Sequence, residues 1–348
     1  MRRLSDLPSP RIAQGGGARI VTLGGGHGQA ALLDALGRFD CHITAIVSVA
    51  DDGGCSGKLR EELGMPPPGD IRRCLVSLAT FKDEAKHFED RLRGEHEEGR
   101  CVGNLVLAEM TQDLGSLQRA VDWAGALLGC VGRVVPVAER AGVLNVYDLV
   151  HGTLAGEAAI ERLSAQTMVA TVAGPEQASP EAIDAIERAD LVFIGPGSFV
   201  GSTLAVLTTG NVAAVIARAP GRRVFVQNVR AEQRDGAPSG ISIADQERIL
   251  RDHLVIGSGG ESVVLDVLSH AADGIKRTLR DDGSYEYGAP VAAPAGTSHD
   301  STRLADALAL FFDLPRRPAR EIAIATAEAQ AIFERYLASA RSRLAQRL

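Results

Sequence analysis

The stretch "RIVTLGGGHGQAALLDAL", from Arg19 to Leu36, constrains the fold more than any other part of the sequence. Its first six residues form an apolar run that is typical of a buried strand, and the residues after the glycines have the apolar spacing of a helix. A glycine turn between a buried strand and a helix is typical of a βαβ unit. The sequence therefore predicts that a parallel sheet begins at this stretch.

The same alternation of apolar strands and helical patterns continues along the chain. We expect further strands at 41–50, 166–174, 190–198, 222–229 and 261–269, with helices between them. Short apolar runs within 132–157 follow one another so closely that we expect an antiparallel excursion there. The predicted fold class is α/β, with a Rossmann-like, mostly parallel sheet flanked by helices.

The two ends of the chain differ in composition from the middle. Residues 1–17 are rich in glycine and proline and predict a flexible N-terminal arm. No linker divides 18–315, so we expect a single Rossmann-like domain there. The arginine-rich segment 316–348 predicts a C-terminal helix, which would serve a homodimer or a protein partner.

Composition excludes several classes of function. A net charge of −7 and an aromatic content of 4% argue against nucleic-acid binding, which needs a basic surface and stacking platforms. No apolar run reaches the length of a membrane span, and no apolar segment follows Arg2 and Arg3 as it would in a signal peptide. Five cysteines without a C-x-x-C pair favour a reducing compartment. We therefore expect a cytoplasmic protein without a membrane span.

The first glycine loop predicts a phosphate site. Gly26, Gly28 and Ala31 have the G-x-G-x-x-(G/A) spacing, between a strand and a helix. Glycines allow a ligand to approach the backbone, and the helix N-terminus offers free N–H groups to an anion. The alternative is a turn whose glycines serve only close packing. The candidate ligand residues of this loop are Gly24, Gly25, Gly26, His27 and Gly28.

The second predicted strand ends in the acidic sequence "ADDGGCSGKL". An acid about 20 residues after the glycine turn binds ribose hydroxyls in dinucleotide folds, and Asp51 lies in that window. Asp51 and Asp52 together also have the hard oxygen ligands that Mg²⁺ prefers near phosphates. A plain surface turn is the alternative. The candidate ligand residues here are Asp51, Asp52, Gly53, Gly54 and Ser56.

Two further segments carry candidate ligand residues. In "PPPGDIRRCL", Asp70 stands where an N-cap would begin a helix, and Arg72 either faces an anionic ligand or lies in solvent. In "IGPGSFVGSTL", Gly195, Gly197 and Ser198 follow an apolar strand and could bind a phosphate or carboxylate, or form a turn without a ligand. Two glycine loops at strand ends are typical of a cleft at a topological switch point.

Together these segments resemble a known family. "GGGHGQAALL", "VADDGGCSGKLREELGMPPPGDIRRCL", "VGNLVLAEM", "ADLVFIGPGS" and "VFVQNV" are similar to the gluconeogenesis factor (YvcK-like) family, which is related to 2-phospho-L-lactate transferase (CofD). The resemblance implies a nucleotide cleft in a CofD/YvcK-type domain, and it adds Asn104 and Asn228 to the candidate ligand residues. His27, Cys55, Arg73 and Arg100 depart from the residues usual in that family.

The resemblance implies a function as well as a fold. We expect a gluconeogenesis factor that binds a nucleotide, either a UDP-sugar or an NAD-like molecule, with Mg²⁺ as a further ligand. Such a protein would regulate cell shape and peptidoglycan precursor supply during gluconeogenic growth without catalysing a reaction. The first alternative is a CofD-like transferase that moves a phospholactyl group to a deazaflavin with Mg²⁺. The second is an NAD-dependent dehydrogenase, which the glycine loop and Asp51 alone would permit.

Overall fold

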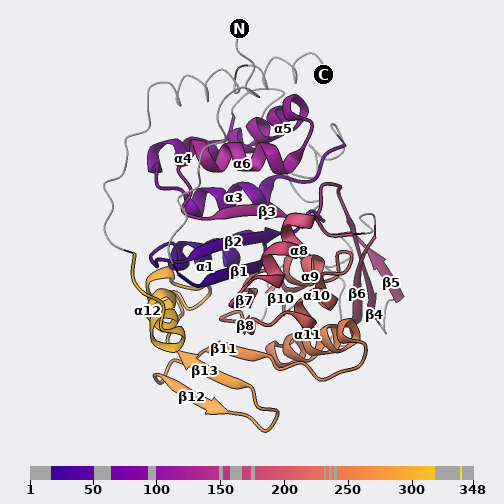
Figure 1. Ribbon diagram of the computed structural model, residues 1–348, viewed down its shortest axis with the longest axis vertical. Helices are drawn as coiled ribbons and strands as arrows, with labels where there is room; N and C mark the ends of the chain where they lie inside the picture. Colours follow the sequence, from indigo (N-terminus) through magenta and orange to yellow (C-terminus); the bar gives the residue numbers. More distant parts are fainter. Residues whose placement is uncertain are drawn as a thin grey trace.

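A central sheet organises the molecule (Figure 1). The computed structural model describes residues 17–50, 64–92, 99–148, 152–156, 167–173, 177–230, 233–234, 237–238, 241–317 and 338. These residues form an eight-stranded sheet in the order β12-β13-β11-β8-β7-β1-β2-β3. Its strands are β1 (Arg19–Gly24), β2 (His42–Val47), β3 (Arg133–Pro136), β7 (Leu191–Ile194), β8 (Arg222–Val226), β11 (Asp266–His270), β12 (Lys276–Leu279) and β13 (Tyr285–Ala289).

Neighbouring strands of this sheet run parallel throughout the described residues, except where β12 pairs antiparallel with β13. The predicted fold class is therefore confirmed. Each parallel crossover needs a long connection, and the helices of the chain provide most of these connections. β1 lies near the middle of the sheet, and its five residues Ile20–Gly24 are buried.

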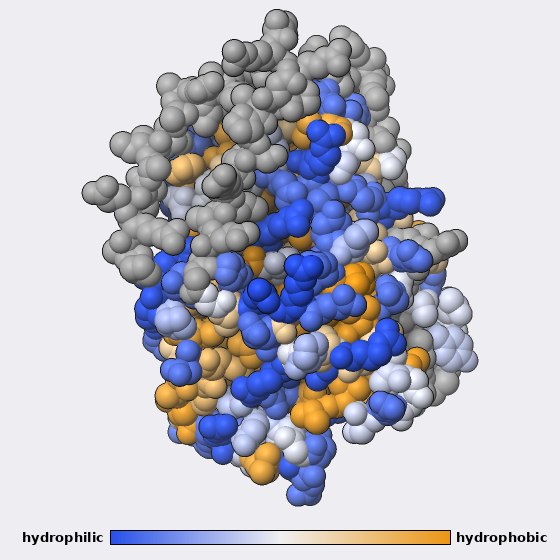
Figure 2. Space-filling model, viewed as in Figure 1, coloured by the Kyte–Doolittle hydropathy of each residue, from blue (hydrophilic) through white to orange (hydrophobic). Residues whose placement is uncertain are grey.

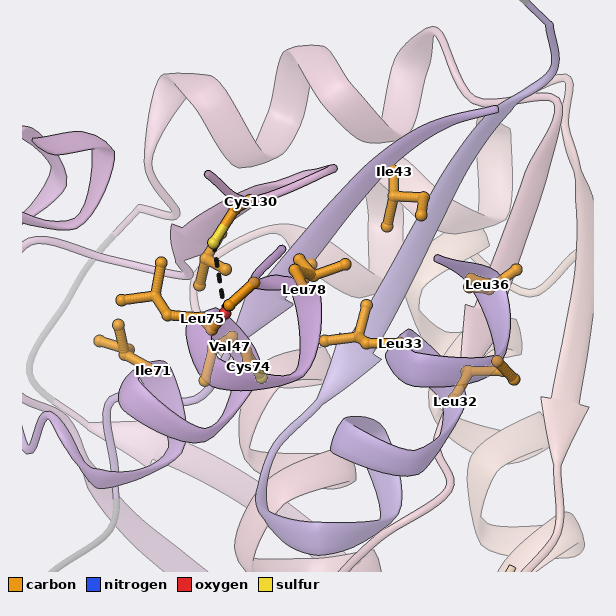
Figure 3. Packing of buried hydrophobic residues seen from close by; sticks show 14 of the residues in the cluster. Leu32, Leu33, Leu36, Ile43, Val47, Ile71, Cys74, Leu75, Leu78 and Cys130 are labelled. Carbon is orange, nitrogen blue, oxygen red and sulfur yellow. Dashed lines mark hydrogen bonds between the residues drawn. The ribbon is translucent and has the colours of Figure 1, made fainter. Parts of the chain in front are cut away.

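Helices cover both faces of the sheet, and each face has its own hydrophobic core among the described residues. On one face Leu33 of α1 and Leu75 of α3 pack with Ile43 of β2 (Figure 3). The helices that contribute to this core are α1 (Gly26–Leu36), α3 (Gly69–Leu78), α4 (Lys82–Glu89), α5 (Val102–Leu114), α6 (Leu117–Leu127) and α12 (Ser301–Phe312). Those of the other core are α8 (Pro180–Glu187), η2 (Phe199–Leu204), α9 (Ala205–Leu207), α10 (Val212–Arg218) and α11 (Ile243–Ser258).

A smaller sheet differs from the strand arrangement that the sequence predicts. In the described part of the chain, β5 (Gly152–Ala155), β4 (Val143–Asp148) and β6 (Thr167–Ala173) form an antiparallel sheet of their own. The antiparallel excursion is thus confirmed for β4 and β5. The assignment of β3 to it was wrong, because β3 pairs parallel with β2, and β6 does not return to the main sheet. The residues of a strand do not indicate which other strand it pairs with. A further short hairpin joins β9 (Gln233–Arg234) to β10 (Ala237–Pro238).

The sequence pattern missed the hairpin of β12 and β13 at one edge of the main sheet. Its signal is the turn around Asp282 and Gly283, because Asp-Gly between two β-prone runs is typical of a hairpin. Hydrophobic surface gathers near this hairpin and α12 (Figure 2), where Leu279 and Leu310 are 61% and 56% exposed. Lys276 on the edge strand disfavours pairing with another strand.

Two predicted segments fall largely outside the described residues. They are residues 1–16 of the N-terminal arm and most of 316–348, so the domain boundaries stay a prediction. Near the end of the described range 241–317, Arg316 forms an isolated antiparallel β-bridge with Phe39. Among the described helices, none is by itself long and apolar enough to cross a membrane. One pair, Phe199–Leu207 with Val212–Arg218, passes that test jointly with a bend of 71°.

Candidate functional site

The carboxyl end of β1 lies at the point where the chain changes direction across the sheet. β1 pairs with β2 on one side and with β7 on the other, and the strands that follow each of these continue outward. At such a switch point the connections leave in opposite directions and open a crevice beyond the strand ends. Both predicted glycine loops, 24–28 after β1 and 195–198 after β7, lie at this edge.

The two glycine loops pack directly against each other. A Cβ atom on Gly28 would lie 2.6 Å from the Cα atom of Gly197, and one on Gly197 would lie 2.8 Å from the carbonyl oxygen of Gly25. The backbones of the two loops are thus in contact at Gly28 and Gly197, and neither position has room for a side chain. Gly26 differs, since its φ is +66° and no described atom lies within 4 Å of its Cβ position. The open side of the first loop is thus at Gly26.

Asn228 and Ser198 hold the second loop in place. The carboxamide of Asn228 accepts a hydrogen bond from the Gly197 N–H at 3.1 Å and donates one to the Gly197 carbonyl at 2.8 Å. The Ser198 hydroxyl accepts a hydrogen bond from the Gly201 N–H at 3.3 Å and caps η2. Both residues therefore position the Gly195–Ser198 loop.

Asp70 lies in the first turn of α3, but not as its cap. The N-cap residue is Pro68, so the predicted capping role of Asp70 was wrong. Its carboxylate accepts a hydrogen bond from Arg73 Nη1 at 2.7 Å and one from the Ser202 hydroxyl at 3.5 Å. A Cβ on Gly25 would collide with this carboxylate. Asp70 therefore lies against the first glycine loop and joins α3 to η2.

Arg72 is a buried cation in α3, two residues after Asp70. Its side chain is 6% exposed, and its nearest described carboxylate is that of Glu89, 3.9 Å from Nη1 and itself 56% exposed. Among the described residues its Nε has no hydrogen-bond partner. Burial lowers the pKa of Arg72 from its ordinary value; Cys101 acts against this shift, and Arg73 acts in the same direction as burial. A guanidinium held in this way favours an anionic ligand.

The Arg72 side chain packs against the start of α5, where Gly103 has no side chain to occupy the same space. A Cβ on Gly103 would lie 2.9 Å from Arg72 Cδ and 2.6 Å from Phe88 Cδ1. Asn104, the next residue, is 2% exposed in the first turn of the same helix. The structure thus brings the start of α5, where Asn104 lies, next to Arg72.

His27 lies in the first turn of α1, with an exposed side chain. Partial burial lowers its pKa below the ordinary 6.5, and the charges of Arg73 and Arg72 lower it further. Asp70 and Glu89 act in the opposite direction with smaller effect than burial and Arg73. His27 is therefore held mainly as a neutral imidazole near pH 7.

The predicted acidic loop comes directly after the end of β2 in the sequence. The Ser48 N–H donates to the Gly24 carbonyl at 3.0 Å, so the end of β2 lies beside the first glycine loop. Asp51, Asp52, Gly53, Gly54 and Ser56 lie outside the described residues. Over the described part of the chain, no group of three or more His, Cys, Asp or Glu side chains is placed to hold a metal ion. The Mg²⁺ site at Asp51 and Asp52 stays a prediction.

Gln29 supports the site but was not predicted. It is fully buried, and its Nε2 donates to the Thr22 hydroxyl at 2.9 Å and to the Ile46 carbonyl at 3.2 Å. Its Oε1 accepts a hydrogen bond from the Cys74 thiol at 3.5 Å. One carboxamide thus joins β1, β2 and α3 beneath the glycine loop. A polar residue on the apolar face of a predicted helix was the available signal.

Known proteins resemble this chain over most of its length. A family model described as 2-phospho-L-lactate transferase CofD matches residues 20–301. The gluconeogenesis factor of Halalkalibacterium halodurans is 34% identical over 277 residues, which are 78% of this chain and 83% of that protein. The gluconeogenesis factor of Bacillus subtilis is 36% identical over 263 residues, 74% of this chain and 81% of that protein.

A solved structure extends the similarity to the fold. A crystal structure of a Bacillus halodurans protein has a TM-score of 0.73 and 29% sequence identity, and the match covers 84% of this chain and 99% of that one. A second structure from that organism, titled as a member of the UPF0052 family, has a TM-score of 0.72. The range matched by the family model includes both glycine loops, Arg72 and Asn228.

Proposed function

The chain belongs to the CofD family, and from that premise we propose that its crevice binds the phosphates of a nucleotide, either a UDP-sugar or an NAD-like molecule. The N-terminus of α1 provides free backbone N–H groups at the open side of the first loop. Arg72 and Arg73 provide positive charge beside it. In this proposal the bound protein acts as a regulator in gluconeogenic growth, on cell shape and peptidoglycan precursor supply, and not as a catalyst.

The observation that carries the proposal is the buried charge of Arg72. Burying a cation costs free energy unless a charged or hydrogen-bonded partner compensates it. Glu89 compensates little, because its carboxylate is 3.9 Å away and mostly in solvent. A phosphate would give the guanidinium a charged partner with matching geometry. Retaining such a residue makes sense for binding and not for stability.

Replacing Arg72 with methionine tests this proposal. We expect Arg72→Met to weaken the binding of UDP-N-acetylglucosamine or NAD at least tenfold, because the charged contact is lost. Its melting temperature without ligand should not fall, because methionine keeps the apolar stem and removes an uncompensated buried charge. Calorimetric titration gives the affinity and a thermal unfolding scan gives the stability.

Arg133→Met is the matched control. Arg133 pairs with Asp122 through two hydrogen bonds of 2.9 and 2.8 Å, at β3 and away from the glycine loops. This variant should lose about 1 kcal/mol of stability and keep the ligand affinity. Equal affinity of Arg72→Met and the unaltered protein would contradict the proposal, as would the failure of both nucleotides to bind the folded chain.

A CofD-like transferase is the second candidate, favoured by the description of the family model that matches residues 20–301. In that case Mg²⁺ would bind near the phosphates, with Asp51 and Asp52 as the proposed ligands. The protein would be mixed with Mg²⁺, a deazaflavin and a phospholactyl- or phosphoenolpyruvyl-nucleotide. A deazaflavin product found by mass spectrometry would establish the transferase, and its absence with both donors would favour the regulator.

A further inference from the structure

Charged side chains of two helices, α3 and α4, act on His27. It occupies the first turn of α1, an 11-residue helix that has no acidic residue in that turn. The described groups that act on its imidazole are Arg72, Arg73 and Asp70 of α3 and Glu89 of α4. The free N–H groups of the α1 N-terminus add partial positive charge.

Positive charge outweighs negative charge around this imidazole. Asp70 is paired with Arg73 at 2.7 Å, so these two charges largely cancel. Glu89 is the remaining described carboxylate, and it is 56% exposed and 3.9 Å from Arg72. Arg72 is thus left with little compensation, and in the free protein burial, Arg73 and Arg72 together oppose a charge on His27.

A bound anion reverses this balance. Two negative charges of a diphosphate placed between Arg72 and the N-terminus of α1 would neutralise the cations that act on His27. They would also offer the imidazole an acceptor for a charge-assisted hydrogen bond. The charged form of His27, disfavoured in the free protein, then becomes favoured in the complex.

We infer that His27 takes up one proton from solvent when a diphosphate binds at the first glycine loop, so that its imidazolium becomes a third cation on the ligand beside Arg72 and Arg73. The inference rests on the proposed function and specifies it. The ligand carries two negative charges at this position, and its binding is coupled to pH. The proton comes from water or buffer, and no covalent bond changes.

Calorimetry in buffers of different ionisation enthalpy measures the coupling. The probe is UDP-N-acetylglucosamine, whose diphosphate is esterified at both ends and has no group that titrates near pH 7. At pH 7 the unaltered protein should take up most of one proton per ligand, seen as a binding enthalpy that depends on the buffer. His27→Gln should bind more weakly and show no dependence on the buffer.

His42→Gln is the matched control. His42 begins β2 at the amino ends of the parallel strands, whereas the glycine loops follow their carboxyl ends. This variant should therefore keep the proton uptake of the unaltered protein. In the unaltered protein the affinity should be highest at low pH and fall by up to tenfold per unit as pH rises through the pKa of bound His27. The affinity of His27→Gln should change much less between pH 6 and 8.

The outcomes separate the inference from the proposed function. Binding of the probe without proton uptake would overturn the role of His27 and leave the nucleotide site standing. Uptake that persists in His27→Gln would do the same, because another group would then be the proton acceptor. Failure of the unaltered protein to bind any nucleotide would overturn the proposed function itself.

Discussion

His299, between β13 and α12, shows how strongly burial changes the pKa of a single side chain. Burial lowers the pKa of its imidazole to about 4, against the opposing effect of a hydrogen bond with the Gln227 backbone. Its Nε2 has no partner within the described ranges. The folded chain therefore holds His299 neutral, while the unfolded chain protonates it near pH 6.5. Stability from this residue is present above pH 6.5 and is lost as pH falls toward 4.

This difference predicts an acid-sensitive contribution to folding. Between pH 7 and pH 5 the free energy of unfolding should fall by about 2 kcal/mol through His299 alone. His299→Gln should lack that part of the decrease, whereas His87→Gln, at an exposed position on α4, should keep it. Urea unfolding at the two pH values measures both. If His299→Gln and the unaltered protein lose equal stability, His299 does not account for the decrease.

At the scale of elements, the packing of the two glycine loops depends on how the strand ends are joined. β7 and β8 are neighbours, and Asn228, just beyond β8, holds the loop that follows β7 through two hydrogen bonds to Gly197. That loop in turn packs on the loop between β1 and α1. The position of the proposed phosphate site therefore depends on three strand ends together, and a change at Asn228 should alter the position of the first loop at Gly26.

Asn228→Ala tests this connection. Losing both hydrogen bonds to Gly197 should cost about 1–2 kcal/mol of unfolding free energy. It should also weaken nucleotide binding, because the second loop no longer fixes the first. Asn211→Ala, at an exposed position where the side chain makes no capping bond, should change neither quantity. Thermal unfolding and calorimetric titration measure both effects. A variant that loses stability but binds normally would show that the loops are independent.

At the scale of the whole molecule, one sheet separates two cores. Leu33 of α1 lies in the core on one face and Ile216 of α10 in that on the other, and both are fully buried. Each core packs on side chains of the same strands, which alternate between the two faces. The loss of either core should therefore unfold the sheet that both share.

The shared sheet predicts a single unfolding transition. Leu33→Ala and Ile216→Ala should each lower the free energy of unfolding by about 2–5 kcal/mol, through the methyl groups removed and the cavity that remains. Both should shift the same transition in a calorimetric scan, and Leu310→Ala, at an exposed position, should leave it almost unchanged. Two transitions, each sensitive to one substitution, would contradict this expectation.

Much of the fold could be predicted because it depends on local pattern. The strand, glycine turn and helix at Arg19–Leu36 are confirmed. Strand partners could not be predicted from the same pattern. The apolar pattern of 166–174 is typical of a buried strand of the main sheet, yet β6 pairs with β4 outside that sheet. Pairing depends on segments that are distant in the sequence.

The α/β class and the glycine loop that follows each strand could be derived from the sequence alone, because periodicity and turn residues act over a few neighbours. The contacts of the candidate residues became visible only in the folded chain. Gly28 meets Gly197 across 169 positions of the chain, Asn228 holds Gly197, and Arg72 is buried with little compensation. Close packing and desolvation arise when distant segments meet, so residue type and spacing alone could not show them.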